Sequence, residues 1–212
     1  MRAQPVERKY LVRDELESVV LVDDQNNAIG SCGKINAHRD GKLHRAFSIL
    51  IINSDGELLL QQRAASKYHF AQRWSNTCCG HPRPGEQTLA AARRRLGEEF
   101  GFSVPLEEVT DLQYRVRDPH SNLIEHEHLH VFLGRYSGEP CPNPDEVGKY
   151  RWMLPDRVRR SLARYPDTFT PWFALLAETL VRSDEIGPGT HAATRAVRWS
   201  ISSPRHRPVI DG

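Results

Sequence analysis

Hydrophobic runs separated by turn-forming residues predict a series of strands along most of the chain. Residues 18–31 read as a strand, an Asp/Asn turn and a second extended segment. Residues 43–63 contain two apolar runs on either side of residues 53–56, whose sequence Asn-Ser-Asp-Gly is typical of a tight turn, so they predict a hairpin. The other expected extended segments are 111–118, 124–136 and, after a turn, 142–154.

Two segments have helical spacing instead. Between residues 86 and 101, Leu89, Ala92 and Leu96 recur at i, i+3 and i+7, and Gly101 stands where a C-terminal cap is expected. Residues 167–182 predict a second helix, with Pro171 near its start. Strands with a few helices indicate a mixed α+β domain.

Length and composition favour one globular domain. The 212 residues are 39% hydrophobic and 26% charged, which is an ordinary balance for a chain with a packed core. We expect a loose arm over residues 1–17, the domain over 18–182, and a disordered basic tail over 183–212, where Gly, Pro and Arg occur without periodicity. A net charge of +2 argues against nucleic acid as a partner but is compatible with a small anionic ligand.

Cysteine usage and the absence of apolar spans favour a cytoplasmic protein. Cys78 and Cys79 are neighbours, and vicinal cysteines are poor partners for a structural disulfide; the start of the sequence does not read as a signal peptide, and no run of about 18 apolar residues occurs. We therefore expect free thiols, a reducing compartment and no membrane association. Cys32 and Cys141 read as small buried residues.

A longer pattern surrounds the first predicted helix. It runs Gly80, five residues, Glu86, seven residues, Arg94-Arg95-Leu96, one residue, Glu98-Glu99, one residue, Gly101-Phe102. A carboxylate pair on a helix suits a hard cation such as Mg²⁺, which often bridges to phosphates. The pattern resembles the Nudix box of diphosphate-handling enzymes, and this resemblance implies an α/β/α sandwich around a mixed β-sheet. Arg95 stands where the family has a glutamate of its hydrolytic metal centre, so it counts against hydrolysis and instead suits a phosphate oxygen.

Histidines and carboxylates form a second candidate site. Glu125 and Glu127 lie two apart on a predicted strand, so both point to one face. With His38, His44 and His81 they make a five-ligand set that suits a divalent transition metal such as Mn²⁺ or Zn²⁺. His126, His128 and His130 would lie on the other face of the same strand as a rival metal patch, but three ligands from one strand are geometrically poor for a closed site. The remaining histidines, His69, His120, His191 and His206, read as structural or exposed.

The segment Asn76-Thr-Cys-Cys-Gly-His-Pro82 makes the resemblance closer. Together with the upstream histidine pair, residues 114–128 and residues 169–173, it is similar to the type 1 isopentenyl-diphosphate delta-isomerases, a divergent branch of the Nudix superfamily. The resemblance covers roughly residues 18–182. It implies that Cys79 is the catalytic thiol and that Cys78 packs.

The resemblance also implies the roles of other residues. It assigns the five-ligand set above to the histidine metal site, and it assigns Glu99 and the backbone carbonyl of Cys79 to a Mg²⁺ on the substrate diphosphate. It places Glu127 opposite Cys79 as the second proton-transfer group, beside Tyr114, and makes Trp172 an aromatic wall, although Tyr114 and Trp172 also fit simple core packing. The basic residues that it places around the diphosphate are Lys34, Arg63, Lys67 and Arg95.

The expected activity is the interconversion of isopentenyl and dimethylallyl diphosphate through a carbocation. Such a reaction needs an acid and a base on opposite faces of the substrate and the exclusion of water. The expected partner is this small diphosphate, and no protein partner is expected. Two alternatives stay open: a Nudix hydrolase of a nucleoside-diphosphate-type substrate, and a non-catalytic diphosphate-binding module.

Overall fold

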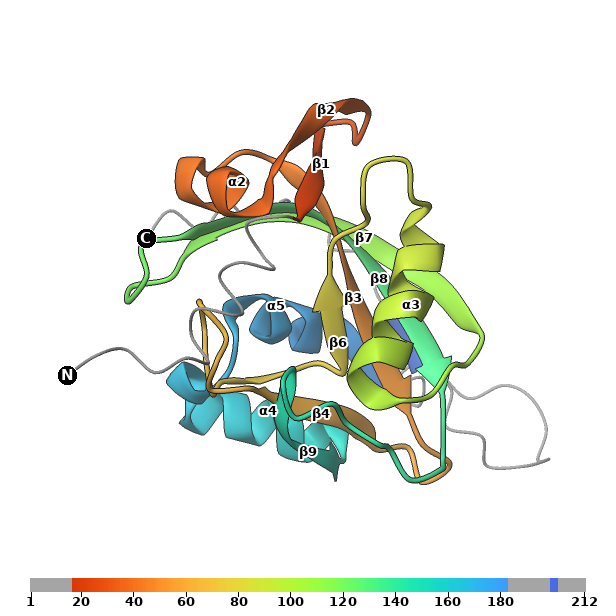
Figure 1. Ribbon diagram of the computed structural model, residues 1–212. Coiled ribbons are helices and arrows are strands. Elements are labelled where there is room, and N and C mark those ends of the chain that lie inside the picture. Colours follow the sequence, from red (N-terminus) through yellow and green to blue (C-terminus); the bar gives the residue numbers. More distant parts are fainter. Residues whose placement is uncertain (1–16, 183–198, 202–212) are drawn as a thin grey trace.

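The computed structural model describes residues 17–182 and 199–201, and one mixed sheet of nine strands organises them. Its central strand is β3 (His44–Ile52). β3 runs parallel to β8 (Ile124–Arg135), from the pair His44 and Glu127 to the pair Ile52 and Arg135, and antiparallel to the short β6 (Cys78–Gly80). These three strands therefore bring distant parts of the sequence together in the middle of the sheet (Figure 1).

The continuous apolar sequence of β3 follows from burial on both faces of the sheet. On one face Ala46 and Leu50 join the core formed with α4 (Pro155–Arg164) and α5 (Pro171–Thr179). On the other face Phe47 and Ile49 pack with residues of α3 (Thr88–Phe100). Helices thus cover both sides of the sheet (Figure 1), and the predicted α/β/α sandwich is confirmed.

The predicted hairpin around residues 53–56 is confirmed at its turn, where Ile52 pairs with Leu58 and Gly56 has a φ of 76°. Beyond the turn the two strands separate. β4 (Leu58–Arg63) pairs instead with β9 (Val147–Met153) and β5 (Trp74–Ser75). Opening the hairpin leaves room for β6 and β8 beside β3.

The other edge of the sheet carries β1 (Ser18–Val22) and β2 (Ala28–Gly33), which confirm the predicted strand, turn and strand. A short helix that sequence reasoning did not find, α2 (Lys34–Asp40), follows directly. β7 (Leu106–Arg117) is longer than expected and pairs antiparallel with β8, so that Tyr114 stands opposite Glu127.

The predicted helix at 86–101 is confirmed as α3, and Gly101 caps it with a φ of 73° while its N–H donates to the carbonyl of Gly97. The second predicted helix was too long. A 3₁₀ turn (Pro166–Thr168) precedes α5, and β10 (Leu180–Arg182) follows it. Helix α4 was missed because it is largely polar, with Pro155 and Val158 as its buried residues.

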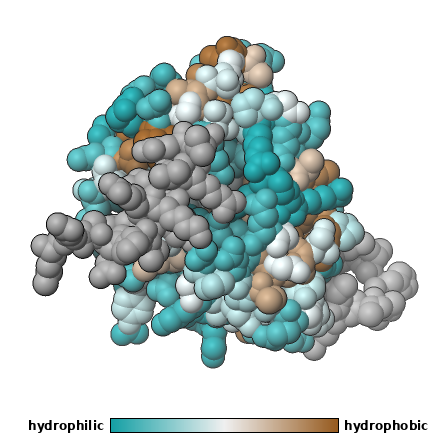
Figure 2. Space-filling model, viewed as in Figure 1, coloured by the Kyte–Doolittle hydropathy of each residue, from teal (hydrophilic) through white to brown (hydrophobic). Residues whose placement is uncertain are grey.

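One part of the expected disordered tail has regular structure, since β11 (Trp199–Ile201) pairs antiparallel with β10. The rest of that tail, and the expected arm up to residue 16, lie outside the described residues. Among the helices of the described ranges, none has the length and hydrophobicity needed to cross a bilayer. On the face that Figure 2 shows, the coloured hydrophobic residues form small separate areas among hydrophilic ones.

Candidate active site

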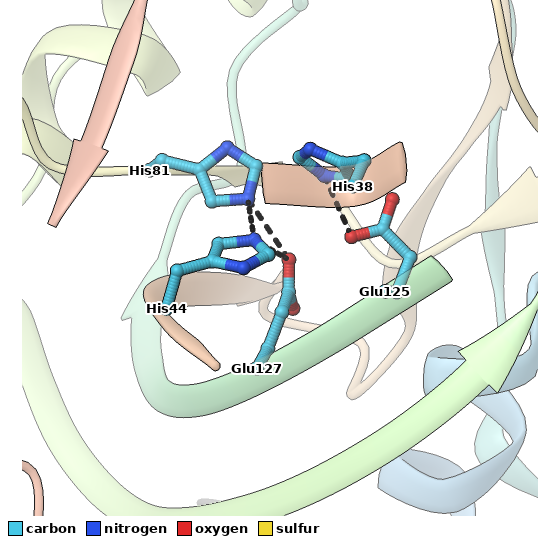
Figure 3. Close-up of side chains that lie close together, drawn as sticks. All are labelled: His38, His44, His81, Glu125 and Glu127. Carbon is cyan, nitrogen blue, oxygen red and sulfur yellow. Dashed lines mark hydrogen bonds and ion pairs between the residues drawn. The ribbon is translucent and has the colours of Figure 1, made fainter. Parts of the chain in front are cut away.

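Five side chains from α2, β3, β8 and the segment after β6 converge at one end of β3 and β8 (Figure 3). His38 comes from the last turn of α2, His44 from the first residue of β3, and His81 directly follows β6. Glu125 and Glu127 alternate on β8, so both point the same way. One ligand atom from each residue lies within 4.8 Å of all the others. The structure therefore gathers the five residues that the sequence analysis grouped.

Backbone contacts orient two of the imidazoles. Nδ1 of His38 lies 2.6 Å from the carbonyl oxygen of Lys34, and Nδ1 of His44 lies 2.8 Å from that of Lys42. Because a carbonyl only accepts, each Nδ1 carries the proton and each Nε2 presents a lone pair to the cluster, as in metal-binding histidines.

Two buried atoms of the cluster have no hydrogen-bond partner. They are Nε2 of His38 and Oε2 of Glu125, which lie 3.0 Å apart without hydrogen-bonding geometry. Nε2 of His81 lies 3.2 Å from Nε2 of His44 and 2.9 Å from Oε1 of Glu127. The two unsatisfied atoms belong to residues of the same group of mutually close ligands, which fits a bound cation.

The electrostatics of the cluster also favour a cation. Burial, reinforced by the charge of Glu125, raises the pKa of Glu127 well above its usual range, since two adjacent buried carboxylates resist ionising together. Burial lowers the pKa of His44 to about 4 and that of His81 well below its usual range. The neutral imidazoles of His44 and His81 beside two carboxyl groups form a donor set for a divalent metal, and binding of such an ion would stabilise both carboxylates in the charged form.

The two adjacent cysteines face opposite sides of β6. Cys78 is fully buried in the core beneath α3, whereas Cys79 lines the pocket beside the histidine cluster. Sγ of Cys79 lies 3.1 Å from Oδ1 of Asn76 and 3.5 Å from Oγ of Ser48. Burial raises the pKa of Cys79 to about 11, so this thiol keeps its proton at neutral pH and can act as a proton donor.

The pocket joins proton-transfer groups to basic side chains. Tyr114 lines it and donates a hydrogen bond of 2.6 Å to Oε2 of Glu127, which also lines it. Trp172 forms part of the wall, is 4% exposed, and donates from Nε1 to Oγ of Ser75 at 3.1 Å. It packs in the core and also lines the pocket, so core packing is confirmed and the role as an aromatic wall stays a prediction. The basic lining residues are Lys34, Arg63, Lys67, Arg83, Arg94 and Arg95.

Arg95 is the centre of a buried charge network. Its Nη2 lies 2.5 Å from Oε1 of Glu99 and 3.1 Å from Oε2 of Glu146, which also contacts Lys67. Although burial opposes ionisation, Lys67 and Arg95 lower the pKa of Glu146 to about 2. The second oxygen of Glu99 accepts a hydrogen bond of 3.0 Å from Gln61. Glu99 is 3% exposed and is not among the lining residues, so the structure does not bring this expected Mg²⁺ ligand to the pocket surface.

Sequence reasoning missed three residues of this region. His69, interpreted as structural or exposed, is 8% exposed, and its Nε2 contacts Oε1 of Glu125; the possibility of exposure was therefore wrong. Asn76 contacts the Cys79 thiol, and Glu146 bridges Lys67 and Arg95. Periodicity contained no signal for these residues, because all three lie in loops.

The other histidines do not form a second site within the described residues. His126 contacts the carbonyl of Gly41, while His128 and His130 contact Asp111 and Glu108. Three different partners hold them, and the rival patch is not among the described groups that could hold a metal. His120 is exposed, as expected, and His191 and His206 lie outside the described residues.

We expect Arg95→Ala to lower the free energy of unfolding by about 3 kcal/mol, because it leaves the buried carboxylates of Glu99 and Glu146 short of a charge partner. The adjacent Arg94 is a matched control, since its ion pairs with Glu86 and Glu98 are more exposed. Arg94→Ala should cost about 1 kcal/mol or less. Urea unfolding followed by circular dichroism measures both values, and equal losses would contradict the assigned network.

Known proteins are similar to this chain in sequence and in fold. Residues 42–173 match the model of the NUDIX domain. Isopentenyl-diphosphate delta-isomerase of Halorhodospira halophila is 49% identical over 165 residues, which are 77% of this chain and 94% of the relative. Isopentenyl-diphosphate delta-isomerase 2 of Photorhabdus laumondii is 50% identical over 168 residues, which are 79% of this chain and 94% of the relative. The Nocardia farcinica isopentenyl-diphosphate delta-isomerase is 49% identical over 161 residues, which are 76% of this chain and 92% of the relative.

Solved structures agree on the fold. The DR0079 protein of Deinococcus radiodurans superposes with a TM-score of 0.65 at 20% identity, covering 76% of this chain and 98% of its own. A MutT protein from Methanosarcina mazei gives a TM-score of 0.54 at 20% identity, and the match covers 64% of this chain and 91% of the MutT protein. The domain match, the sequence identity over most of the chain and the shared fold all lead to one assignment: the chain belongs to the isopentenyl-diphosphate delta-isomerase family of the Nudix superfamily.

Proposed function

We propose that this protein interconverts isopentenyl diphosphate and dimethylallyl diphosphate. The observation that carries the proposal is one pocket lined by the Cys79 thiol, by the Glu127 carboxyl of the metal-type cluster, which is bonded to Tyr114, and by a group of basic side chains. The names of the relatives reported above support the same reaction.

The proposed reaction moves a double bond by two proton transfers. A proton adds to the terminal alkene carbon, whose π electrons form the new C–H bond and leave a positive charge on C3. Loss of a proton from C2 returns an electron pair to the C2–C3 bond, so the product is an isomer and no atoms are gained or lost. Cys79 and Glu127 would serve as the two proton-transfer groups, and their order in each direction stays open.

The proposed metal at the histidine site is Mn²⁺ or Zn²⁺, held by the five converging residues. When bound, such an ion supplies Lewis acidity that withdraws charge from the Glu127 carboxyl. Tyr114 holds that carboxyl in place by its hydrogen bond. Around the reacting carbons, the indole of Trp172 would face the positive charge, a contact worth about 0.5–2 kcal/mol.

The diphosphate would lie against Lys34, Arg63, Lys67 and Arg95, all of which line the pocket. Mg²⁺ is the ion expected to accompany the diphosphate, with Glu99 and the Cys79 carbonyl as its protein ligands. In the described structure both oxygens of Glu99 are already occupied by Arg95 and Gln61. Mg²⁺ bound there would share Glu99 with these two partners or displace one of them, and phosphate oxygens offer the guanidinium a new partner.

Two features argue against the alternatives. Hydrolysis of a nucleoside-diphosphate-type substrate needs carboxylates where Arg95 lies, and this side chain pairs with Glu99 and Glu146. A non-catalytic binding module has no need for a buried thiol beside a Tyr–Glu pair. The cytoplasmic location expected from the sequence stays a prediction.

Proton NMR in D₂O tests the proposal directly. With isopentenyl diphosphate, Mg²⁺ and Mn²⁺ or Zn²⁺, we expect dimethylallyl methyl signals, deuterium incorporation and no release of phosphate. Phosphate release without isomerisation would contradict the proposal and support the hydrolase alternative. Binding of the diphosphate with neither reaction would favour the binding module.

A further inference from the structure

We propose that His69 is a positioning residue of the histidine metal site, which fixes Glu125 by donating its Nε2–H to one carboxylate oxygen. The inference rests on the proposed function only in requiring a divalent metal at the five-residue cluster. His69 lies outside that cluster of mutually close ligand atoms, so its proposed role is exerted through Glu125.

The two oxygens of Glu125 have different neighbours. Oε1 contacts Nε2 of His69, on the loop between β4 and β5, whereas Oε2 lies 3.0 Å from Nε2 of His38 inside the cluster. Oε2 is buried and has no hydrogen-bond partner, while Oε1 is in contact with His69. This division leaves Oε2 for an ion and prevents the carboxylate from rotating away. Carboxylates that bind metals are commonly held by such a second contact.

Burial decides which protonation form of the His69 ring contacts Glu125. Its Nδ1 is buried and has no hydrogen-bond partner. A doubly protonated ring would leave Nδ1–H as an unpaired buried donor, whereas the neutral Nε2–H form leaves only a lone pair there. The ring is also enclosed, with centroids 4.3 Å from Tyr68, 5.7 Å from Phe70 and 6.5 Å from Trp172. Its orientation is therefore fixed by packing.

Two hydrogen bonds fix the backbone of the loop that carries His69. Nη2 of Arg63 donates to the carbonyl of His69 at 3.1 Å, and the N–H of Phe70 donates to Oδ2 of Asp118 at 3.3 Å. Phe70 has a φ of 46°, in the left-handed region that a bulky residue avoids unless its surroundings impose it. The strained turn directly after His69 keeps this histidine pointed at Glu125.

Metal titrations of three variants test the proposal. His69→Leu keeps most of the side-chain volume but removes the donor, His69→Gln supplies an amide donor, and His120→Ala removes an exposed histidine outside the site. Each metal-free protein is titrated with Co²⁺, and the dissociation constant and the visible absorption of the bound ion are recorded. We expect His69→Leu to weaken binding by about 10–100-fold and to change the Co²⁺ spectrum. His69→Gln should recover much of the affinity, and His120→Ala should match the unmodified protein.

Equal dissociation constants and spectra for His69→Leu and the unmodified protein would overturn the role of His69 while leaving the proposed function intact. Loss of affinity in His69→Leu and His69→Gln alike would also overturn it, because the effect would then follow from packing and not from the donor. Failure of the unmodified protein to bind Co²⁺ would overturn the metal site and the role of His69 with it, and isomerisation in the NMR assay above would then show that the proposed reaction stands.

Discussion

Replacing Cys79 by alanine is expected to reduce turnover by about 10²–10⁴-fold, the usual contribution of a positioned acid or base. The thiol lines the pocket and keeps its proton, since burial raises its pKa to about 11. An alanine has no proton to exchange, but it leaves the basic side chains of the pocket in place. We therefore expect binding of the diphosphate, measured by calorimetry, to change little while the isomerisation rate falls.

Cys78→Ala is the matched control for this result. The Cys78 side chain is fully buried on the opposite side of β6, in the core under α3. Its removal should cost about 1–2 kcal/mol of stability and leave turnover of the folded protein near that of the unmodified one. If the two variants exchanged these effects, the assignment of the thiol would be wrong. An unchanged rate in Cys79→Ala would exclude this residue from the chemistry.

Glu127→Gln is expected to have an effect of similar or larger size, because this residue has two proposed roles. Its carboxyl lies 2.9 Å from Nε2 of His81 through one oxygen and accepts the Tyr114 hydrogen bond through the other. An amide of the same shape neither exchanges a proton readily nor contributes negative charge to an ion. We expect turnover to fall by at least about 10²–10⁴-fold and the affinity for Mn²⁺ to fall by at least about 10-fold.

Glu107→Gln provides the comparison, since Glu107 is an exposed glutamate of β7 in the same sheet. Isomerisation followed by NMR and Mn²⁺ binding followed by electron paramagnetic resonance separate the two roles of Glu127. A normal rate at saturating Mn²⁺ would limit Glu127 to metal binding. Normal metal affinity with a low rate would limit it to proton transfer.

Much of the site could be predicted because its residues lie on regular elements. Alternation along a strand places Glu125 and Glu127 on one face, whereas the choice of Cys79 over Cys78 came from the resemblance to the isomerases. The spacing of the box likewise predicts α3 and its cap at Gly101, as the structure has them. These features are local, since each depends on residues within a few positions of one another.

Residues on loops escaped prediction for the opposite reason. His69 and Glu146 reach the site through turns whose direction depends on contacts with distant residues, such as the bond from Phe70 to Asp118. Local periodicity contains no record of such contacts. The short helix α2 and the polar helix α4 were missed for a related reason, because too few of their residues are buried to produce an apolar repeat.

The sequence by itself determined the layered fold, the five histidine and glutamate residues of the cluster, and the replacement of a box glutamate by Arg95. The cluster residues follow from residue type and spacing, whereas the layered sandwich and the replaced glutamate follow from the resemblance to the Nudix box. Only the tertiary structure decided how the charges are paired: Arg95 holds Glu99 and Glu146, and His69 holds Glu125. The physical reason is that ion pairs and hydrogen bonds form across space between segments far apart in the chain, and the geometry of the folded sheet selects which of many compatible partners meet.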